Sequence, residues 1–158
     1  MCGDLRRGRT VRSLSYLMKN FEDITIIFAA PSAFQMKEDV CSFLESHKIS
    51  YEVETETLKS VLSRADAIYM TRIQDEHDDI AGESGKIDTS SFKLKPSDMS
   101  KVKSRAGIMH PFPRRDEIDV AIDHDPRAMY WRQERNGMWT RAALIAYIFE
   151  VHEEILKY

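Results

Sequence analysis

Apolar residues gather in short continuous runs along the chain, and polar or proline residues close each run. The runs cover residues 24–30, 67–70 and 106–109. A continuous apolar run of this length is typical of a parallel strand buried on both faces. Tyr51 and Val53 alternate with glutamates instead, a pattern that predicts an outer strand.

Between these runs, apolar residues recur at the spacing of a helix. Apolar residues three or four positions apart predict helices over 10–19 and 36–47, a short helix near 58–62, and a long final helix from about Gly137 to Leu156. Strands that alternate with helices are typical of an α/β domain, so we expect a doubly wound, mostly parallel sheet flanked by helices. A length of 158 residues suits one domain.

The segment 74–103 interrupts this alternation. It is polar, contains Gly82 and Gly85, and is rich in acidic residues between Asp75 and Glu83. Loops of this length inside a domain are usually either functional lids or flexible segments. The pattern leaves both interpretations open.

Polar side chains follow several of the predicted strands. Arg72 and Gln74 come after one strand and share a face in extended chain. The run HPFP, residues 110–113, follows another strand, and Arg9 stands at the start of the helix 10–19, where backbone donors favour an anion. Open parallel sheets bind ligands at the carboxyl ends of their strands. Two arginines and an amide are therefore expected in one crevice that suits a dicarboxylate.

Two alternatives compete with this interpretation. Arg72 and Gln74, considered alone, fit ordinary solvated loop residues. The stretch GDLRRGRT, residues 3–10, also lies one residue from the phosphate-binding pattern G-x-x-x-x-G-K-[ST], with Arg9 in place of the lysine. No G-x-G-x-x-G pattern occurs, so a dinucleotide site is not expected.

Composition narrows the classes of function. The net charge is −3 with both signs mixed, so we expect no nucleic-acid partner. No apolar run is long enough to span a bilayer and the start has no signal-peptide core, so we expect no membrane association and a cytoplasmic protein. The two cysteines and five histidines show no ligand spacing, so no metal site is expected.

The motifs GDLRRGRTVRSL, YMTRIQ and HPFPRRDEI, in this order, make the chain similar to the catalytic chain of aspartate carbamoyltransferases. The resemblance covers essentially all 158 residues and is to the carboxyl-terminal, aspartate-binding half of that chain. Ornithine carbamoyltransferases share the fold but lack the T-R-x-Q element and carry a cysteine in the motif equivalent to HPFP. Pro111 in that place, together with Arg72 and Gln74, favours aspartate over ornithine.

The resemblance implies catalytic and substrate-binding roles for the motif residues. Arg9 would hold the α-carboxylate of L-aspartate and Arg72 its side-chain carboxylate, while Gln74 would assist near the same end. Asp4 is implied as a supporting partner of these groups. Arginine suits such roles because it stays protonated and grips a carboxylate through two bonds.

The loop HPFP has its own implied role. The backbone carbonyls of Pro111 and Phe112 would accept hydrogen bonds from the carbamoyl amide and the attacking amine, and the peptide between Phe112 and Pro113 would be cis. The implied reaction is attack of the aspartate amine on carbamoyl phosphate, catalysed by positioning and charge stabilisation. Neither a metal nor an organic cofactor is implied, and the family forms homo-oligomers, namely trimers.

Departures from the family limit what the chain is expected to do alone. The loop after T-R-x-Q carries Asp75-Glu76-His77 where K-E-R is common, and acidic residues beside a dianionic substrate are expected to weaken closure of a lid. The carbamoyl-phosphate half, with its S-T-R-T-R motif, has no counterpart. We therefore expect residues 1–158 to form an aspartate-binding domain that binds L-aspartate, and carbamoyl phosphate only with a complementing half.

The same comparison predicts two exposed surfaces. Only Met1 and Cys2 precede Gly3, where the family has an apolar central strand, so we expect a domain that lacks its first strand and exposes two strand edges. The final helix is expected to be partly exposed, because its apolar residues are spread too far around its circumference to pack on one face. These are Leu144, Ile145, Ile148, Phe149 and Val151. A non-catalytic dicarboxylate-binding or regulatory relic of the enzyme remains the alternative function.

Overall fold

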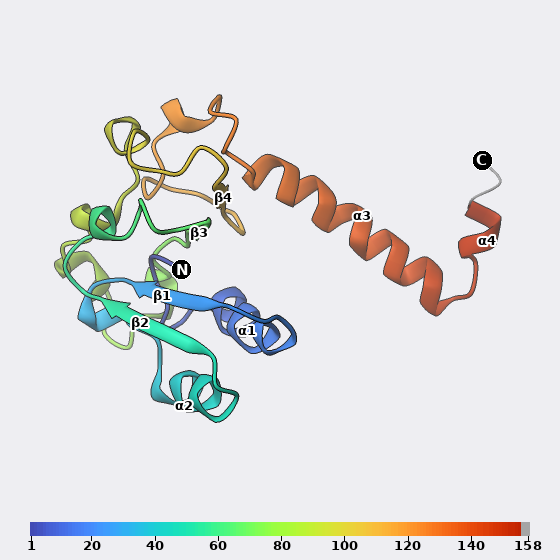
Figure 1. The fold of residues 1–158 in the computed structure, drawn as a ribbon, viewed down its shortest axis with the longest axis horizontal. Helices are drawn as coiled ribbons and strands as arrows, with labels where there is room; N and C mark the ends of the chain where they lie inside the picture. The colour runs from blue at the N-terminus through green and yellow to red at the C-terminus, as the bar shows by residue number, and fades with distance from the viewer. Residues whose placement is uncertain (156–158) are drawn as a thin grey trace.

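The computed structural model describes residues 1–155 and has parallel strands with helices around them (Figure 1). The strands are β1 (Thr25–Ala29), β2 (Ser50–Glu54), β3 (Ala67–Tyr69) and β4 (Gly107–Met109). β1 pairs in parallel with β2, and β3 pairs in parallel with β4. The predicted α/β class with parallel strands is confirmed.

The first residues of the chain join these two pairs of strands. Cys2 forms parallel bridges to Ala29 of β1 and to Met70, which follows β3. Its N–H donates to the carbonyl of Tyr69 at 2.8 Å, and its own carbonyl accepts the N–H of Thr71 at 2.8 Å. The strand order is therefore β2, β1, Cys2, β3, β4, with one bridging residue in the middle.

The helices agree with the predicted ranges in the first half of the chain. Their bounds are α1 (Arg9–Leu17), α2 (Glu38–Ser46), α3 (Tyr130–Ile148) and α4 (His152–Ile155). Buried Val11 of α1 and Val40 and Leu44 of α2 pack around Phe28 of β1 and form one hydrophobic cluster. The apolar stripes of these two helices thus cover the β1–β2 pair.

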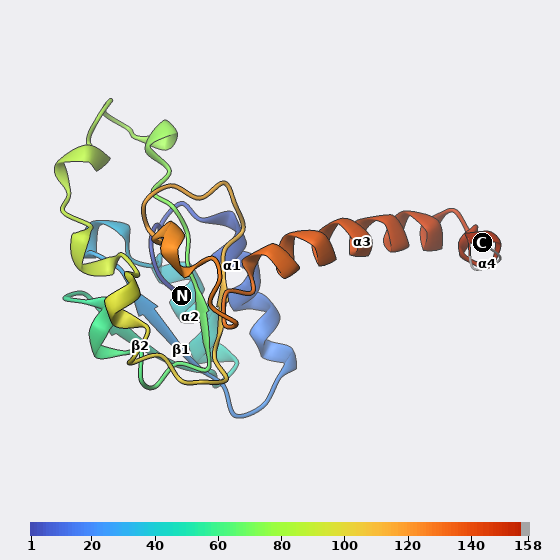
Figure 2. The same ribbon diagram turned by 90° about the horizontal axis from the view of Figure 1, so that it is seen from above.

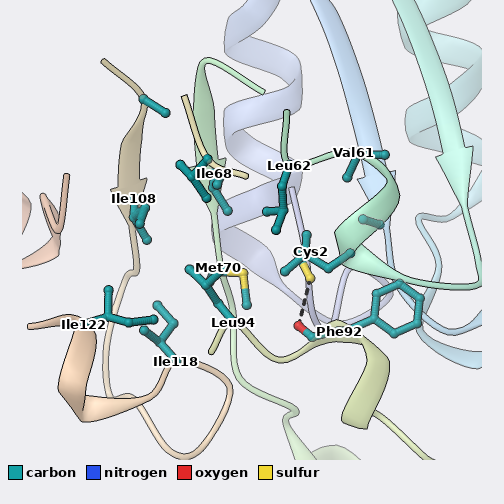
Figure 3. Packing of buried hydrophobic residues seen from close by; sticks show 14 of the residues in the cluster. Cys2, Val61, Leu62, Ile68, Met70, Phe92, Leu94, Ile108, Ile118 and Ile122 are labelled. Carbon is teal, nitrogen blue, oxygen red and sulfur yellow. Dashed lines mark hydrogen bonds between the residues drawn. The ribbon is translucent and has the colours of Figure 1, made fainter. Parts of the chain in front are cut away.

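A second hydrophobic cluster packs around the β3–β4 pair. Its centre is formed by side chains that are almost fully buried, and Figure 3 shows how they meet. They include Cys2, Leu62, Ile68, Met70, Leu94, Ile108, Ile118 and Ile122. Cys2 belongs to this cluster through its side chain, and its Sγ donates to the carbonyl of Phe92 at 3.5 Å.

The segment 74–103 is more ordered than its polarity suggests. Four short 3₁₀ turns lie within it, over 75–77, 84–86, 90–92 and 96–98. Phe92 and Leu94 are buried in the second cluster. The later part of the segment is therefore anchored in the core.

The final helix differs from its prediction at both ends. α3 begins at Tyr130 rather than at Gly137, because the ring of Tyr130 is fully buried and fixes the first turn against the domain. Glycine is a poor helix former, which made Gly137 resemble a boundary. The helix stops at Ile148, the backbone of Glu150 is left-handed, and α4 follows. Leu156 lies outside the described residues.

Beyond its first turn, α3 projects away from the rest of the chain, as Figures 1 and 2 show from two directions. Only Tyr130 and Ala146 are buried along it. The predicted bare face is confirmed, because all five apolar residues named for it are exposed. Within residues 1–155, no helix is both long and apolar enough to cross a membrane.

Gly3 connects the bridging residue Cys2 to the loop that follows, and replacing it should weaken the fold. Its φ is +107°, and an added Cβ would lie 1.9 Å from the carbonyl oxygen of Thr71. Gly3→Ala is expected to lower the free energy of unfolding by about 3 kcal/mol in urea denaturation, through backbone strain and this overlap. Gly85→Ala is the matched control, since nothing lies within 4 Å of its added Cβ. Equal losses in the two variants would contradict the prediction.

Candidate functional site

Arg9 lies where the sequence predicts, at the first position of α1. It lines a hollow of about 640 Å³ together with Arg12, Gln74 and His77. Gln74 belongs to the segment after β3, so two of the predicted site residues from distant parts of the chain share this hollow. The helix start and the guanidinium both favour an anion there.

Arg72 lines a second hollow, of about 570 Å³, with Asp75, Glu76, Pro113 and Arg115 among its other lining residues. Its guanidinium faces Glu76 through both terminal nitrogens: Nη1 donates to Oε2 at 2.8 Å, and Nη2 donates to Oε1. This bidentate arrangement holds the pKa of Glu76 well below its usual range. Arg72 is therefore already engaged with a carboxylate.

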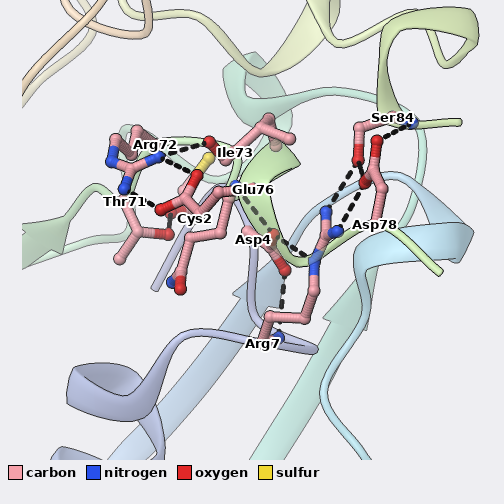
Figure 4. A network of polar contacts seen from close by, with 10 residues as sticks. Cys2, Asp4, Arg7, Thr71, Arg72, Ile73, Glu76, Asp78 and Ser84 are labelled. Atoms are coloured by element: carbon pink, nitrogen blue, oxygen red, sulfur yellow. Dashed lines mark hydrogen bonds and ion pairs between the residues drawn. The ribbon is translucent and has the colours of Figure 1, made fainter. Parts of the chain in front are cut away.

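The buried carboxylate of Asp4 ties the two regions together, as Figure 4 shows. Its Oδ2 accepts the Nε–H of Arg7 at 2.8 Å and the backbone N–H of Gln74 at 3.1 Å. Its Oδ1 accepts the backbone N–H of Arg7 at 3.0 Å. Asp4 thus holds the backbone at Gln74, in the segment that also carries Arg72.

Arg7 extends this network to the loop that follows. Its Nη1 donates to Asp78 Oδ1 at 2.6 Å, and its Nη2 donates to Ser84 Oγ at 2.8 Å. The side chain of Asp78 is only 3% exposed. The sequence patterns did not identify Arg7 or Asp78 as site residues; the one local signal was an arginine three positions after an aspartate.

The loop GDLRRGRT is not arranged to cradle phosphate. The backbone N–H groups of Leu5 and Arg6 donate to the carbonyl of Phe34, and that of Gly8 donates to the carbonyl of Asp4. The N–H of Arg7 is bound to the Asp4 carboxylate. Because these four donors are already used, the structure does not favour the alternative of a nucleotide-binding loop.

The loop HPFP follows β4 and has the predicted backbone. The peptide between Phe112 and Pro113 is cis, which confirms the prediction. The N–H of Phe112 donates to Nδ1 of buried His110 at 2.9 Å, so the ring proton of His110 lies on Nε2, which meets Glu117 Oε1 at 2.7 Å. These bonds fix the path of the carbonyls of Pro111 and Phe112.

The first turn of α3 supports the same loop from the side. The ring of Phe112 lies 5.0 Å from that of Trp131 and 5.9 Å from that of Tyr130, measured between centroids. The side-chain oxygen of Gln133 accepts the N–H of His110 at 2.9 Å. No local pattern in the chain indicates this support, because it depends on where α3 begins.

The structure places some of the predicted site residues together, but Arg9 and Arg72 line different hollows. Arg9 and Gln74 line the first hollow, and Arg72 lines the second beside Pro113. That the two arginines grip one diacid stays a prediction. Among the described residues, no group of three or more histidine, cysteine, aspartate or glutamate side chains is placed to hold a metal ion.

Comparison with known proteins agrees with the motifs. Residues 1–148 match the sequence model of the aspartate/ornithine carbamoyltransferase Asp/Orn binding domain. The chain is 39% identical over 148 residues to a chloroplastic aspartate carbamoyltransferase of Pisum sativum, covering 92% of this chain and 37% of the relative. It is 40% identical over 146 residues to the multifunctional protein CAD of Squalus acanthias, covering 92% of this chain and 6% of the relative.

Solved structures lead to the same family. The catalytic subunit of M. jannaschii aspartate transcarbamoylase superposes with a TM-score of 0.81 at 34% identity, covering 96% of this chain and 48% of that one. The Trypanosoma cruzi enzyme in complex with N-(phosphonacetyl)-L-aspartic acid gives a TM-score of 0.82 at 35% identity, with 91% and 46% covered. The chain thus spans less than half the length of these relatives. It belongs to the aspartate/ornithine carbamoyltransferase family, as a match to its Asp/Orn binding domain.

Proposed function

We propose that this chain is the aspartate-binding half of a carbamoyltransferase that makes N-carbamoyl-L-aspartate from carbamoyl phosphate and L-aspartate in pyrimidine biosynthesis. The observation that carries the proposal is the geometry of Arg72. At the carboxyl edge of β3, its guanidinium faces a carboxylate through both terminal nitrogens. A diacid substrate offers the same group, and arginine binds it through a planar, two-bond contact.

The second carboxylate of the substrate is assigned to Arg9 and the reacting end to the loop HPFP. Arg9 lies at the start of α1, and Gln74 lines the same hollow. The carbonyls of Pro111 and Phe112 would accept hydrogen bonds from the amine and the carbamoyl amide, which positions the amine for attack on the carbonyl carbon. Attack forms the new C–N bond and a tetrahedral intermediate, whose collapse breaks the C–O bond to phosphate. The departing phosphate takes up the proton that the amine loses.

Relatives support the choice of substrates. Trypanosoma cruzi aspartate transcarbamoylase has been solved with carbamoyl aspartate and phosphate bound, and with carbamoyl phosphate and aspartate bound. This chain has no S-T-R-T-R run for gripping phosphate. The proposed activity therefore requires a complementing carbamoyl-phosphate half, and the proposed assembly is a homo-oligomer of completed subunits, trimeric as in the family.

The loop 75–87 is proposed as the lid of the aspartate site. Three of its five acidic residues have arginine partners: Asp75 pairs with Arg115 at 2.8 Å, Glu76 with Arg72, and Asp78 with Arg7 at 2.6 Å. Weak closure is expected because the loop is acidic beside a dianionic substrate, and these three pairs compensate part of that negative charge. Exchange of Glu76 for a substrate carboxylate on Arg72 would couple binding to movement of the loop.

The alternative, a non-catalytic dicarboxylate-binding or regulatory relic, is favoured by one observation. Glu76 occupies the guanidinium of Arg72 on its own loop, so the chain satisfies this arginine without a ligand. Location in the cytoplasm also stays a prediction; the plant relatives are named as chloroplastic.

Loss of either arginine should weaken binding of a diacid. Titration calorimetry with L-aspartate and with succinate is expected to show binding to the intact chain. Arg9→Gln and Arg72→Gln should each weaken it by about 10- to 100-fold, the effect of one lost charged hydrogen-bond pair. Arg64→Gln is the matched control, because Arg64 is exposed and pairs with Glu52 outside both hollows. Unchanged affinity in the two site variants would contradict the proposal.

A turnover assay distinguishes the aspartate-binding half of an enzyme from a non-catalytic relic. Formation of carbamoyl-aspartate is measured for the chain alone and after addition of a carbamoyl-phosphate half from the Pisum sativum relative. Activity only in the mixture is expected. Activity of the chain alone would contradict the requirement for a second half, and binding without activity in the mixture would favour the relic.

Protonation of Asp78 should release the loop from Arg7. Hydrogen bonds from Ser84 and Arg7 lower the pKa of Asp78 to about 2, so the folded state favours the ionised carboxylate. The stabilisation is present above the ordinary pKa of an aspartate, about 4, and disappears as the pH falls toward 2. Asp78→Asn should therefore have a lower Tm than the original chain at pH 7. The difference in Tm between the two should disappear as the pH falls toward 2. Asp79→Asn, on the neighbouring exposed residue, should match the original chain at every pH.

A further inference from the structure

The second hollow, of about 570 Å³, contains an arginine that the proposed function does not use. Arg115, from the loop after β4, lines this hollow together with Arg72, which follows β3. Two neighbouring carboxylates, those of Asp75 and Glu76, line it as well. Arginines from two separate segments and carboxylates from a third therefore meet in one hollow.

Each arginine is bound by a carboxylate from the same short turn. Arg115 Nη1 donates to Asp75 Oδ2 at 2.8 Å. Arg72 Nη1 donates to Glu76 Oε2 at 2.8 Å, as Figure 4 shows. Both carboxylates belong to one 3₁₀ turn, Asp75–His77. This turn thus presents two negative charges side by side, and a different guanidinium binds each of them.

The two guanidiniums are close enough to act on each other. Asp75 raises the pKa of Arg115 through a hydrogen bond and through its charge, whereas the positive charge of Arg72 opposes this rise. Two like charges that share a hollow repel, so negative charge between them is favourable. The turn Asp75–His77 supplies that charge with its own two carboxylates.

The two ion pairs are open to exchange with a ligand. The side chains of Asp75 and Glu76 are 49% and 44% exposed. Ion pairs this exposed contribute little to stability, because water solvates both partners and salt screens them. The side chain of Arg72 is only 19% exposed, so its direction is restricted by its surroundings. An anion can therefore replace the carboxylates of the turn while this arginine keeps its place.

A third acidic residue of the hollow, Asp78, does not take part in this exchange. Its Oδ1 accepts from Arg7 Nη1 at 2.6 Å, and its Oδ2 accepts the backbone N–H of Ser84 at 3.0 Å. Its side chain is almost fully buried. Because Arg7 compensates its charge, the balance of the hollow is set by two arginines against the two carboxylates of the turn.

This balance selects the class of ligand. Removal of both carboxylates of the turn leaves two uncompensated positive charges in the hollow. A single carboxylate restores half of the balance, whereas a dianionic group restores all of it. Phosphate and phosphonate groups carry up to two negative charges and three acceptor oxygens, enough to bind two guanidiniums at once.

From these contacts we infer that the second hollow binds a dianionic phosphate or phosphonate end group, which contacts Arg72 and Arg115 together in place of the two carboxylates of the turn. Arg115 then determines selectivity for such a group over a monoanion. The inference goes beyond the proposed function, which gives Arg115 no role, and shares only Arg72 with it. A small acid of this kind competes with L-aspartate for that arginine.

Three acids with the same carbon chain test the inference: succinate, sulfopropionate and phosphonopropionate. Their second end groups are a planar monoanion, a tetrahedral monoanion and, above the second ionisation of the phosphonate, a tetrahedral dianion. In titration calorimetry with the whole chain, phosphonopropionate is expected to bind at least about tenfold more tightly than sulfopropionate, the effect of one added charged contact. Because these two acids have the same shape, equal affinity would overturn the inference.

Replacement of Arg115 should remove this preference. In Arg115→Gln, the affinities for phosphonopropionate and sulfopropionate are expected to become equal within about twofold, because only Arg72 remains. Arg64→Gln is the matched control: Arg64 is 53% exposed, against 51% for Arg115, and pairs with a half-exposed glutamate outside this hollow. A preference that survives in Arg115→Gln would overturn the inference.

A competing role for Arg115 is to hold the loop in place through Asp75 without contacting a ligand. Asp75→Asn distinguishes the two roles. If Arg115 contacts the phosphonate, this change frees the guanidinium and should strengthen phosphonopropionate binding, whereas Arg115→Gln weakens it. If Arg115 only holds the loop, both changes break the same ion pair and should alter the affinity in the same direction, which would overturn the inference.

NMR of the arginine side chains locates the ligand on the original chain. The Nε–H signals of Arg72 and Arg115 are expected to shift together on addition of phosphonopropionate, while that of Arg64 stays unchanged. Circular dichroism checks that the variants fold, and if one does not, these signals and the comparison of acids decide. An unchanged Arg115 signal at saturation would overturn the inference.

Succinate separates this inference from the proposed function. Binding of succinate and L-aspartate without a preference for the phosphonate overturns the inference and leaves the proposed function in place. A preference for the phosphonate that depends on Arg115, without binding of succinate or L-aspartate, supports the inference and contradicts the proposed function. Absence of binding by all of these acids contradicts both.

Discussion

The backbone hydrogen bonds of Met1 and Cys2 hold the two halves of the sheet together. Cys2 donates to Tyr69 and accepts from Thr71 on one side, while the Met1 carbonyl accepts from Ala29 on the other. The thiol of Cys2 is also buried, and burial raises its pKa to about 12, so it stays protonated and packs as a small apolar group. A few backbone hydrogen bonds of Met1 and Cys2 thus make the connection between β1 and β3 that a full strand makes in larger parallel sheets.

The candidate site depends directly on this contact. The left-handed turn at Gly3 leads from the bridging residue to Asp4, whose carboxylate binds Arg7 and the backbone of Gln74. Movement of β3 relative to β1 would therefore move Gln74 away from its support. The loop HPFP is supported separately, by His110 and by the first turn of α3. The proposed substrate site is thus assembled from parts that are fixed by different contacts.

The sequence predicted the elements whose signals are local. The apolar runs marked the strands, and Arg9 was placed at a helix start because the stripe after it is regular. The start of α3 was wrong, since it is set by burial of Tyr130, a long-range contact that no local pattern contains. The segment 74–103, for which the sequence left a lid and a flexible loop open, contains the buried side chain of Leu94, a contact that its polar composition does not indicate.

The site residues were identified by motif, whereas their contacts were not. A motif gives residue types and spacing, and it predicted the cis peptide before Pro113. The engagement of Arg72 with Glu76 depends on side-chain rotamers and loop position, which spacing does not encode. Arg7 was missed because its partners Asp78 and Ser84 lie more than seventy residues along the chain.

The projecting helix α3 gives the chain a built-in optical signal. Both tryptophans of the sequence, Trp131 and Trp139, lie on it. Trp131 stacks beside Phe112, while Trp139 is 62% exposed. Tryptophan fluorescence therefore reports the surroundings of this one helix, and a surface that covers its outer turns would shift the emission of Trp139 to the blue.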